Sequence, residues 1–127
     1  MTDPRETLNR IRKQADNATE GPWEADGSAH VLTAGNTPTF VARCADPDDS
    51  DAGVPDAEFV AAARTTVPAL LDALEAVLAV HAPDYTYPDC PKCAECSDIA
   101  STAARRFAVL WPCETVEAIT TALDAIK

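Results

Sequence analysis

The sequence has 127 residues, of which 46% are hydrophobic and 24% charged, and its formal net charge is −11 at pH 7. The hydrophobic share is too high for a wholly disordered chain and suits one domain with a thin, largely helical core. The charge makes DNA and acidic membrane lipids poor partners, because like charges repel.

The first predicted element is a helix over residues 3–18. Thr2 or Asp3 can cap its N-terminus, and Pro4 suits its first turn. Leu8 and Ile11 begin an apolar stripe that continues at helical spacing.

A small antiparallel meander is expected next. Gly21-Pro22 breaks the helical pattern, and turn signals separate short β-prone runs. These runs lie near residues 23–25, 30–33 and 39–44, which predicts two or three strands.

Residues 46–58 carry six acidic side chains and no basic one. They do not match a calcium-binding loop, because Asp51 stands where that loop needs glycine and Ala57 stands where it needs glutamate. We interpret the segment as a hydrated loop, with Asp56 capping the helix that follows.

The strongest helical signal covers residues 57–81. The following residues repeat at helical spacing: Val67, Leu71, Leu74, Leu78 and His81. Leu70 and Val77 widen this leucine stripe. Pro68 cannot donate a backbone hydrogen bond, so a kink or a break is expected there.

The C-terminal part combines a cysteine-rich loop with two shorter helices. One helix is predicted over residues 98–111, capped by Ser97 or Asp98. The last is predicted over residues 113–127, with an apolar side made of Val116, Ile119, Leu123 and Ile126. The predicted fold class is therefore α+β: an N-terminal helix, a small antiparallel β-meander, a long kinked helix and zinc-stapled C-terminal helices. We expect an α+β domain over residues 1–81 and a zinc-stapled helical segment over residues 82–127 packed on it.

The cysteine-rich loop predicts a metal site. The candidate ligands are His81, Cys90, Cys93, Cys96 and Cys113. Zinc takes four sulfur or nitrogen ligands in a tetrahedron, and a Cys-x-x-Cys pair supplies two of them. Cys113 would lie near the first turn of the last helix, where free N–H groups favour thiolate. From the residues alone we expect Cys93, Cys96 and Cys113 to bind, with His81 and Cys90 competing for the fourth place.

Structural zinc is the leading interpretation, and an iron–sulfur cluster and unmetallated thiols are the alternatives. The N-terminal residues are polar, and no apolar run approaches the roughly 20 residues that a membrane span needs. We therefore expect a cytoplasmic protein without membrane contact, in which clustered cysteines bind metal more readily than they form disulfides. Cys44, on a predicted strand, is interpreted as a small buried residue.

Motifs of catalysis are absent from the sequence. There is no His-Glu-x-x-His, no Gly-rich phosphate loop and no Gly-x-Ser-x-Gly, and no His-x-Glu precedes the Cys-x-x-Cys pairs. Arg64, Arg105 and Arg106 could hold a phosphate, and any of them beside a cavity would favour such binding, but we interpret them as solvated helix residues. The chain is therefore predicted not to be an enzyme.

Two stretches carry a resemblance to a known family. "ATEGPWEADGS", the acidic loop and "DAEFVAAARTTVPALLDALEAVL" resemble the Ead-like small accessory proteins of phages and prophages, especially those of actinobacterial phages. The tail "HAP…CAEC…WPCETVEAI" looks like a cysteine module often appended in that group, and this resemblance implies the ligand set His81, Cys93, Cys96 and Cys113. The sequence departs from the module by the additional Cys90 and by a long insert between Cys96 and Trp111. The family has no established general activity.

These observations lead to one functional hypothesis and its alternatives. We expect a non-enzymatic phage accessory protein with a structural zinc site, acting in the host cytoplasm by binding a host protein in host takeover or anti-defence. A homodimer through the leucine stripe or the last helix is kept open, and direct nucleic-acid binding is not expected. The alternatives are a sponge for a host signalling nucleotide, an acidic DNA mimic built on residues 46–58, and a zinc enzyme.

Overall fold

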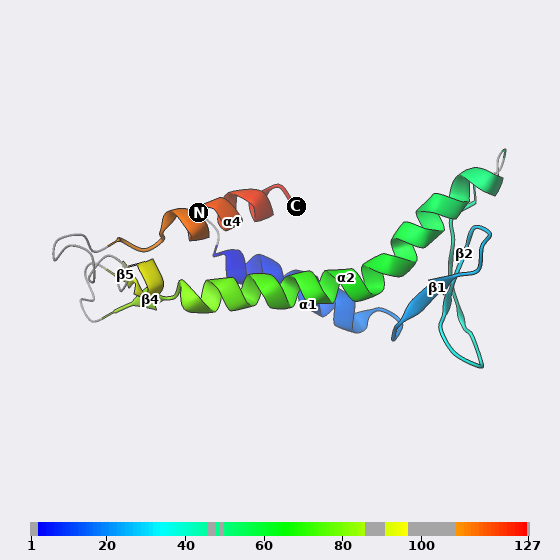
Figure 1. Ribbon diagram of the computed structural model, residues 1–127, viewed down its shortest axis with the longest axis horizontal. Coiled ribbons are helices and arrows are strands. Elements are labelled where there is room, and N and C mark those ends of the chain that lie inside the picture. Colours follow the sequence, from blue (N-terminus) through cyan, green and yellow to red (C-terminus); the bar gives the residue numbers. More distant parts are fainter. Residues whose placement is uncertain (1–2, 46–47, 49, 86–90, 97–108, 127) are drawn as a thin grey trace. The chain divides into compact units, whose positions relative to one another are not determined.

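The computed structural model describes residues 3–45, 48, 50–85, 91–96 and 109–126. It is an α+β structure, as the sequence predicts, with an N-terminal helix, a three-stranded antiparallel sheet, one long helix and a C-terminal helix (Figure 1). The chain forms two compact units, Ile11–Leu71 and Met1–Arg10 with Asp72–Lys127. The division into an α+β domain over residues 1–81 and a zinc-stapled segment over residues 82–127 stays a prediction.

The unit Ile11–Leu71 contains the sheet. Its strands β1 (Trp23–Ala25), β2 (His30–Thr33) and β3 (Phe40–Arg43) pair in the order β1-β2-β3, all antiparallel. The meander is therefore confirmed, with three strands at the predicted positions. A register shift between Val31 and Leu32 interrupts the pairing of β2 with β3.

The core of this unit lies between the sheet and the beginning of α2 (Gly53–Val80). Val31 and Ala57 are fully buried, and Trp23 and Val41 pack against them. Gly53 allows this packing, because a side chain there would lie 2.7 Å from the carbonyl carbon of Cys44. The backbone that follows β3 therefore passes close to the start of α2. A short 3-10 helix, η1 (Ser50–Ala52), directly precedes α2 in the chain.

Helix α2 begins four residues before the predicted position. Asp56 lies in its first turn and is not the cap, so that expectation is wrong. Pro55 explains the earlier start, because proline is favoured where helical N–H groups have no partner. Pro68 lies inside the helix, which continues through it and is not broken into two.

The other unit combines the first turns of α1 (Pro4–Asn17) with the last turns of α2 and with α4 (Glu114–Asp124). Asp3 caps α1, since the N–H of Arg5 donates to its Oδ1 at 2.9 Å. Arg10 donates to the carbonyl of Ile126 at 2.9 Å, which joins α1 to the end of the C-terminal helix. Val116 and Leu123 of α4 are buried, as the predicted stripe requires, but the helix ends at Asp124 and Ile126, predicted to continue the stripe, is 50% exposed.

The segment after α2 contains structure that was not predicted. Strands β4 (Pro83–Asp84) and β5 (Lys92–Cys93) form a two-stranded antiparallel sheet, and residues 94–96 are helical. The helix predicted over residues 98–111 falls mostly outside the described residues, and residues 109–111 are not helical.

Candidate metal centre

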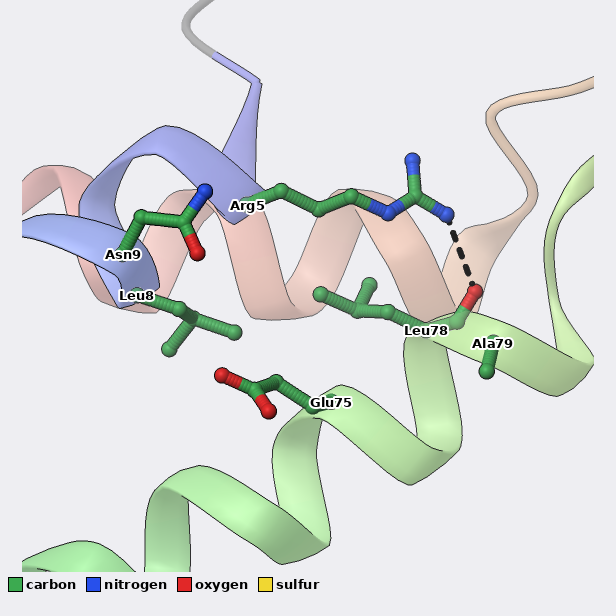
Figure 2. A pocket seen from close by; sticks show the side chains of 6 residues that line it. All are labelled: Arg5, Leu8, Asn9, Glu75, Leu78 and Ala79. Atoms are coloured by element: carbon green, nitrogen blue, oxygen red, sulfur yellow. Dashed lines mark hydrogen bonds between the residues drawn. The ribbon is translucent and has the colours of Figure 1, made fainter. Parts of the chain in front are cut away.

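His81 follows directly on the last turn of α2. Its N–H donates to the carbonyl of Val77 at 3.1 Å, so the residue continues the helical pattern. Arg5 stabilises this end of the helix, because its Nη2 donates to the carbonyl of Leu78 at 3.1 Å (Figure 2). A cation beside the last carbonyls of a helix is favourable, since these carbonyls lack intrahelical partners. Leu8 and Leu78 lie beside the same cavity as Arg5 and are each 1% exposed. These contacts hold the end of α2, and with it the backbone of His81, in place.

The pairing of β4 with β5 brings the first cysteine back to the histidine. Cys93 on β5 is opposite Pro83 on β4, two residues after His81. The helical turn at residues 94–96 then carries Cys96 round to the same side. A Cys-x-x-Cys pair on such a turn presents two sulfurs to one ion.

Cys113 lies at the start of α4, in a third part of the chain that reaches the cluster. It is the N-cap residue of α4, with extended backbone angles and no side-chain capping bond. Trp111 positions this segment, because its Nε1–H donates to the carbonyl of His81 at 3.0 Å and its backbone N–H donates to Pro91 at 3.0 Å. The same residue therefore fixes the approach of Cys113 and the backbone of His81.

The four side chains meet around one point. His81 Nδ1 lies 3.4 Å from the sulfur of Cys93 and 3.5 Å from the sulfurs of Cys96 and Cys113. All four atoms lie within 4.8 Å of one another. An imidazole nitrogen carries at most one hydrogen, so these contacts are not three hydrogen bonds. Tetrahedral zinc, with Zn–N near 2.0–2.1 Å and Zn–S near 2.3 Å, places nitrogen and sulfur about 3.5 Å apart. The cluster can hold a metal ion such as zinc.

The electrostatics of the cluster also favour a cation. Loss of hydration and the neighbouring thiols of Cys93 and Cys113 raise the pKa of Cys96 to about 12. Burial opposes ionisation of Cys113 too, but the N–H groups of Val116 and Thr115 and the neighbouring thiols bring its pKa below the usual value. A thiolate at Cys113 thus makes ionisation of a second thiol beside it less favourable. A bound cation removes this conflict, because a coordinating thiol is deprotonated.

The structure brings together His81, Cys93, Cys96 and Cys113, the set that the resemblance implies. Cys90, the alternative fourth ligand, lies outside the described residues. Cys44 belongs to the other unit, where it packs against the core around Val31. Ligation itself stays a prediction.

A second polar cluster, which was not predicted, surrounds His30. Its Nδ1 lies 3.1 Å from Asp26 Oδ2 and 3.1 Å from the hydroxyl of Ser28. A Ser-His-Asp relay needs the serine and the carboxylate on different ring nitrogens, and here both contact the same one. Hydrogen bonds from the Ser28 hydroxyl and N–H, together with His30, lower the pKa of Asp26 to about 2. The cluster stabilises the turn before β2.

Of the three arginines considered for phosphate binding, Arg64 lines a groove in the unit Ile11–Leu71. Arg105 and Arg106 lie outside the described residues. Among the helices that the structure describes, none is both long enough and apolar enough to span a membrane.

The sequence and the fold were compared with family models, curated proteins and solved structures, and none of the three comparisons gives a match. The resemblance to Ead-like phage proteins therefore stays a prediction.

Proposed function

We propose that this chain is a non-enzymatic phage accessory protein in which a structural zinc ion holds the C-terminal segment and which acts by binding a host protein. The observation that carries the zinc assignment is one nitrogen at nearly equal distances from three sulfurs. Four protein ligands fill a tetrahedron and leave no position for water, which is typical of structural zinc and not of catalytic zinc.

Zinc is favoured over an iron–sulfur cluster by the size and composition of the site. Ligand atoms within 4.8 Å of one another leave room for one ion rather than for several irons and bridging sulfides. Three thiolates and one imidazole also form a common ligand set of structural zinc.

Binding of a macromolecule is supported by the exposed side of α2. Within the unit Ile11–Leu71, from Phe59 to Leu70, its exposed residues are alanines, larger apolar residues and two threonines, with no charged one in this fully described stretch. Phe59 is 77% exposed and Leu70 58%. A helix that is apolar on both sides is normally buried on both.

The charge of the chain favours one kind of partner. A net charge of −11 opposes self-association and attracts basic surfaces. We therefore assign to this face a host protein that presents an apolar patch with basic residues at its rim. The mode would be helix packing, with leucine and valine side chains as anchors.

Elemental analysis of protein purified without added metal tests the zinc assignment. We expect about one zinc per chain, retained by Cys44→Ser and lost from Cys93→Ser. Cobalt substitution should give the intense visible bands of a tetrahedral thiolate site. Iron with sulfide, or equal metal loss in both variants, would overturn the assignment.

Affinity capture from host lysate, with identification by mass spectrometry, tests the partner. A specific partner should be retained by Phe40→Glu, which changes an exposed aromatic on β3, and lost with Leu70→Glu on α2. Sedimentation velocity on the purified chain measures whether it forms a dimer without any partner. A dimer that Leu70→Glu dissociates would assign the face to a second copy instead.

A further inference from the structure

An open groove lies in the unit Ile11–Leu71, between α1, β1 and the middle of α2, and has a volume of about 270 Å³. Its walls are mainly aliphatic and include Ile11, Ala15, Ala63 and Val67. An apolar cavity of about 150 Å³ takes up one benzene ring. The space here suits a flat system of two fused rings.

Two side chains with recognition chemistry line this groove and are held in place. Arg64 Nε and Trp23 Nε1 both donate to the carbonyl of Thr19, at 3.0 Å and 3.1 Å. The guanidinium lies 5.7 Å from the centroid of the Trp23 ring. A guanidinium has five N–H donors, and this contact uses one of them. The groove therefore combines an aromatic surface with a cation that can bind a carboxylate or phosphate.

Pro68 changes the backbone hydrogen bonding of α2 beside the groove. In an α-helix the N–H of residue 68 would donate to the carbonyl of residue 64, and proline has no N–H. The carbonyl of Arg64 thus lacks its helical donor where both residues line the groove. Gln14, also at the groove, offers an amide that both donates and accepts.

We propose that this groove binds a small two-ring heteroaromatic anion. The rings lie among the aliphatic walls beside Trp23, and the anionic group pairs with Arg64. A single cation in a strongly acidic protein selects one carboxylate or one phosphate monoester. Purine mononucleotides and indole carboxylates share this chemistry. The inference does not depend on the metal or on the host protein, since the groove and the four-ligand cluster belong to different units.

NMR titration of the zinc-loaded full chain tests the proposal, with guanosine 5′-monophosphate and indole-3-acetate as anionic probes and guanosine as the neutral one. We expect at least one anion to bind with a dissociation constant below about 1 mM. The indole N–H signal of Trp23 should shift, whereas that of Trp111 at the metal centre should not. The binding probe identifies the source, nucleotide or indole-type acid.

Two matched variants locate the site. Ala63→Leu fills the groove and should weaken binding at least tenfold, whereas Ala62→Leu, one residue earlier and outside the groove, should leave it unchanged. Arg64→Gln should abolish the preference for the anion over guanosine. The melting curve of Arg64→Gln shows whether the fold survives loss of the contact to Thr19. If this variant does not fold, Ala63→Leu still tests the site. Absence of binding by both anions, equal effects of the two leucine variants, or equal binding of guanosine and its monophosphate would overturn the proposal.

Discussion

Replacing Cys113 by serine should release α4 from the rest of its unit. Ordering the 11 residues of α4 costs about 16 kcal/mol, at roughly 1.5 kcal/mol per residue. Burial of the side chains of Val116 and Leu123 returns about 3–6 kcal/mol. The shortfall, about 10–13 kcal/mol before backbone hydrogen bonds are counted, is of the size that a structural zinc ion supplies, roughly 10–16 kcal/mol.

Hydrogen–deuterium exchange of the zinc-loaded protein measures this release. A loss of only about 4 kcal/mol lowers amide protection about 10³-fold, so peptides from α4 should exchange much faster in Cys113→Ser than in the wild type. Peptides from β1–β3 provide an internal reference. Cys44→Ser is the matched control, because it changes a cysteine of the other unit and should leave α4 protected. Unchanged protection of α4 in Cys113→Ser and in chelator-treated wild type would refute the reasoning.

Three further predictions concern the support of the site and the sheet. Trp111→Phe removes the hydrogen bond to the carbonyl of His81 and should weaken zinc binding about tenfold in competition with a chromophoric chelator; an unchanged affinity would contradict a supporting role. Gly53→Ala places a methyl group against the backbone after β3 and should lower the free energy of unfolding by about 1–3 kcal/mol in urea titrations, with no change if the close approach is absent. The Asp26 carboxyl should titrate near pH 2 by NMR, because Ser28 donates to it, so its stabilisation is complete above the unfolded pKa near 3.9 and is lost as the pH falls through about 2; a value near 4 would contradict these hydrogen bonds.

The sheet and the main helices could be predicted because each rests on local chemistry. The β-prone runs between turn residues mark the three strands to within a residue. The acidic residues after the third run indicate where the sheet ends and the approach to α2 begins. The start of α2 was predicted four residues too late because Asp56 was taken as the cap, whereas the helix begins at Gly53, has Pro55 in its first turn and lies close to the backbone of Cys44. Spacing in the sequence carries no information about such an approach.

The apolar residues of α2 show another limit. Leu70 was expected to widen the buried stripe and is 58% exposed, whereas Leu71 is 4% exposed. Because the helix carries apolar residues all around, its periodicity cannot tell which side packs against the same chain.

The cysteines of the cluster were predictable from spacing and from the position of Cys113 before a helix. His81 was a candidate because it ends the leucine stripe. The contacts that support it, from Arg5 and from Trp111, join segments far apart in the sequence and follow no local pattern. The pairing of β4 with β5 also left no pattern in the sequence, because each strand has only two residues.

The contacts beside the cluster have a consequence for how this chain can change over evolution. The N–H of Cys93 donates to the carbonyl of Val109, and the N–H of Trp111 donates to the carbonyl of Pro91. These bonds join backbone atoms and depend on the register in which Lys92 lies opposite Leu110. Substitutions within residues 91–93 or 109–111 can therefore keep this pairing, whereas an insertion or deletion there would shift it and move the cysteines apart.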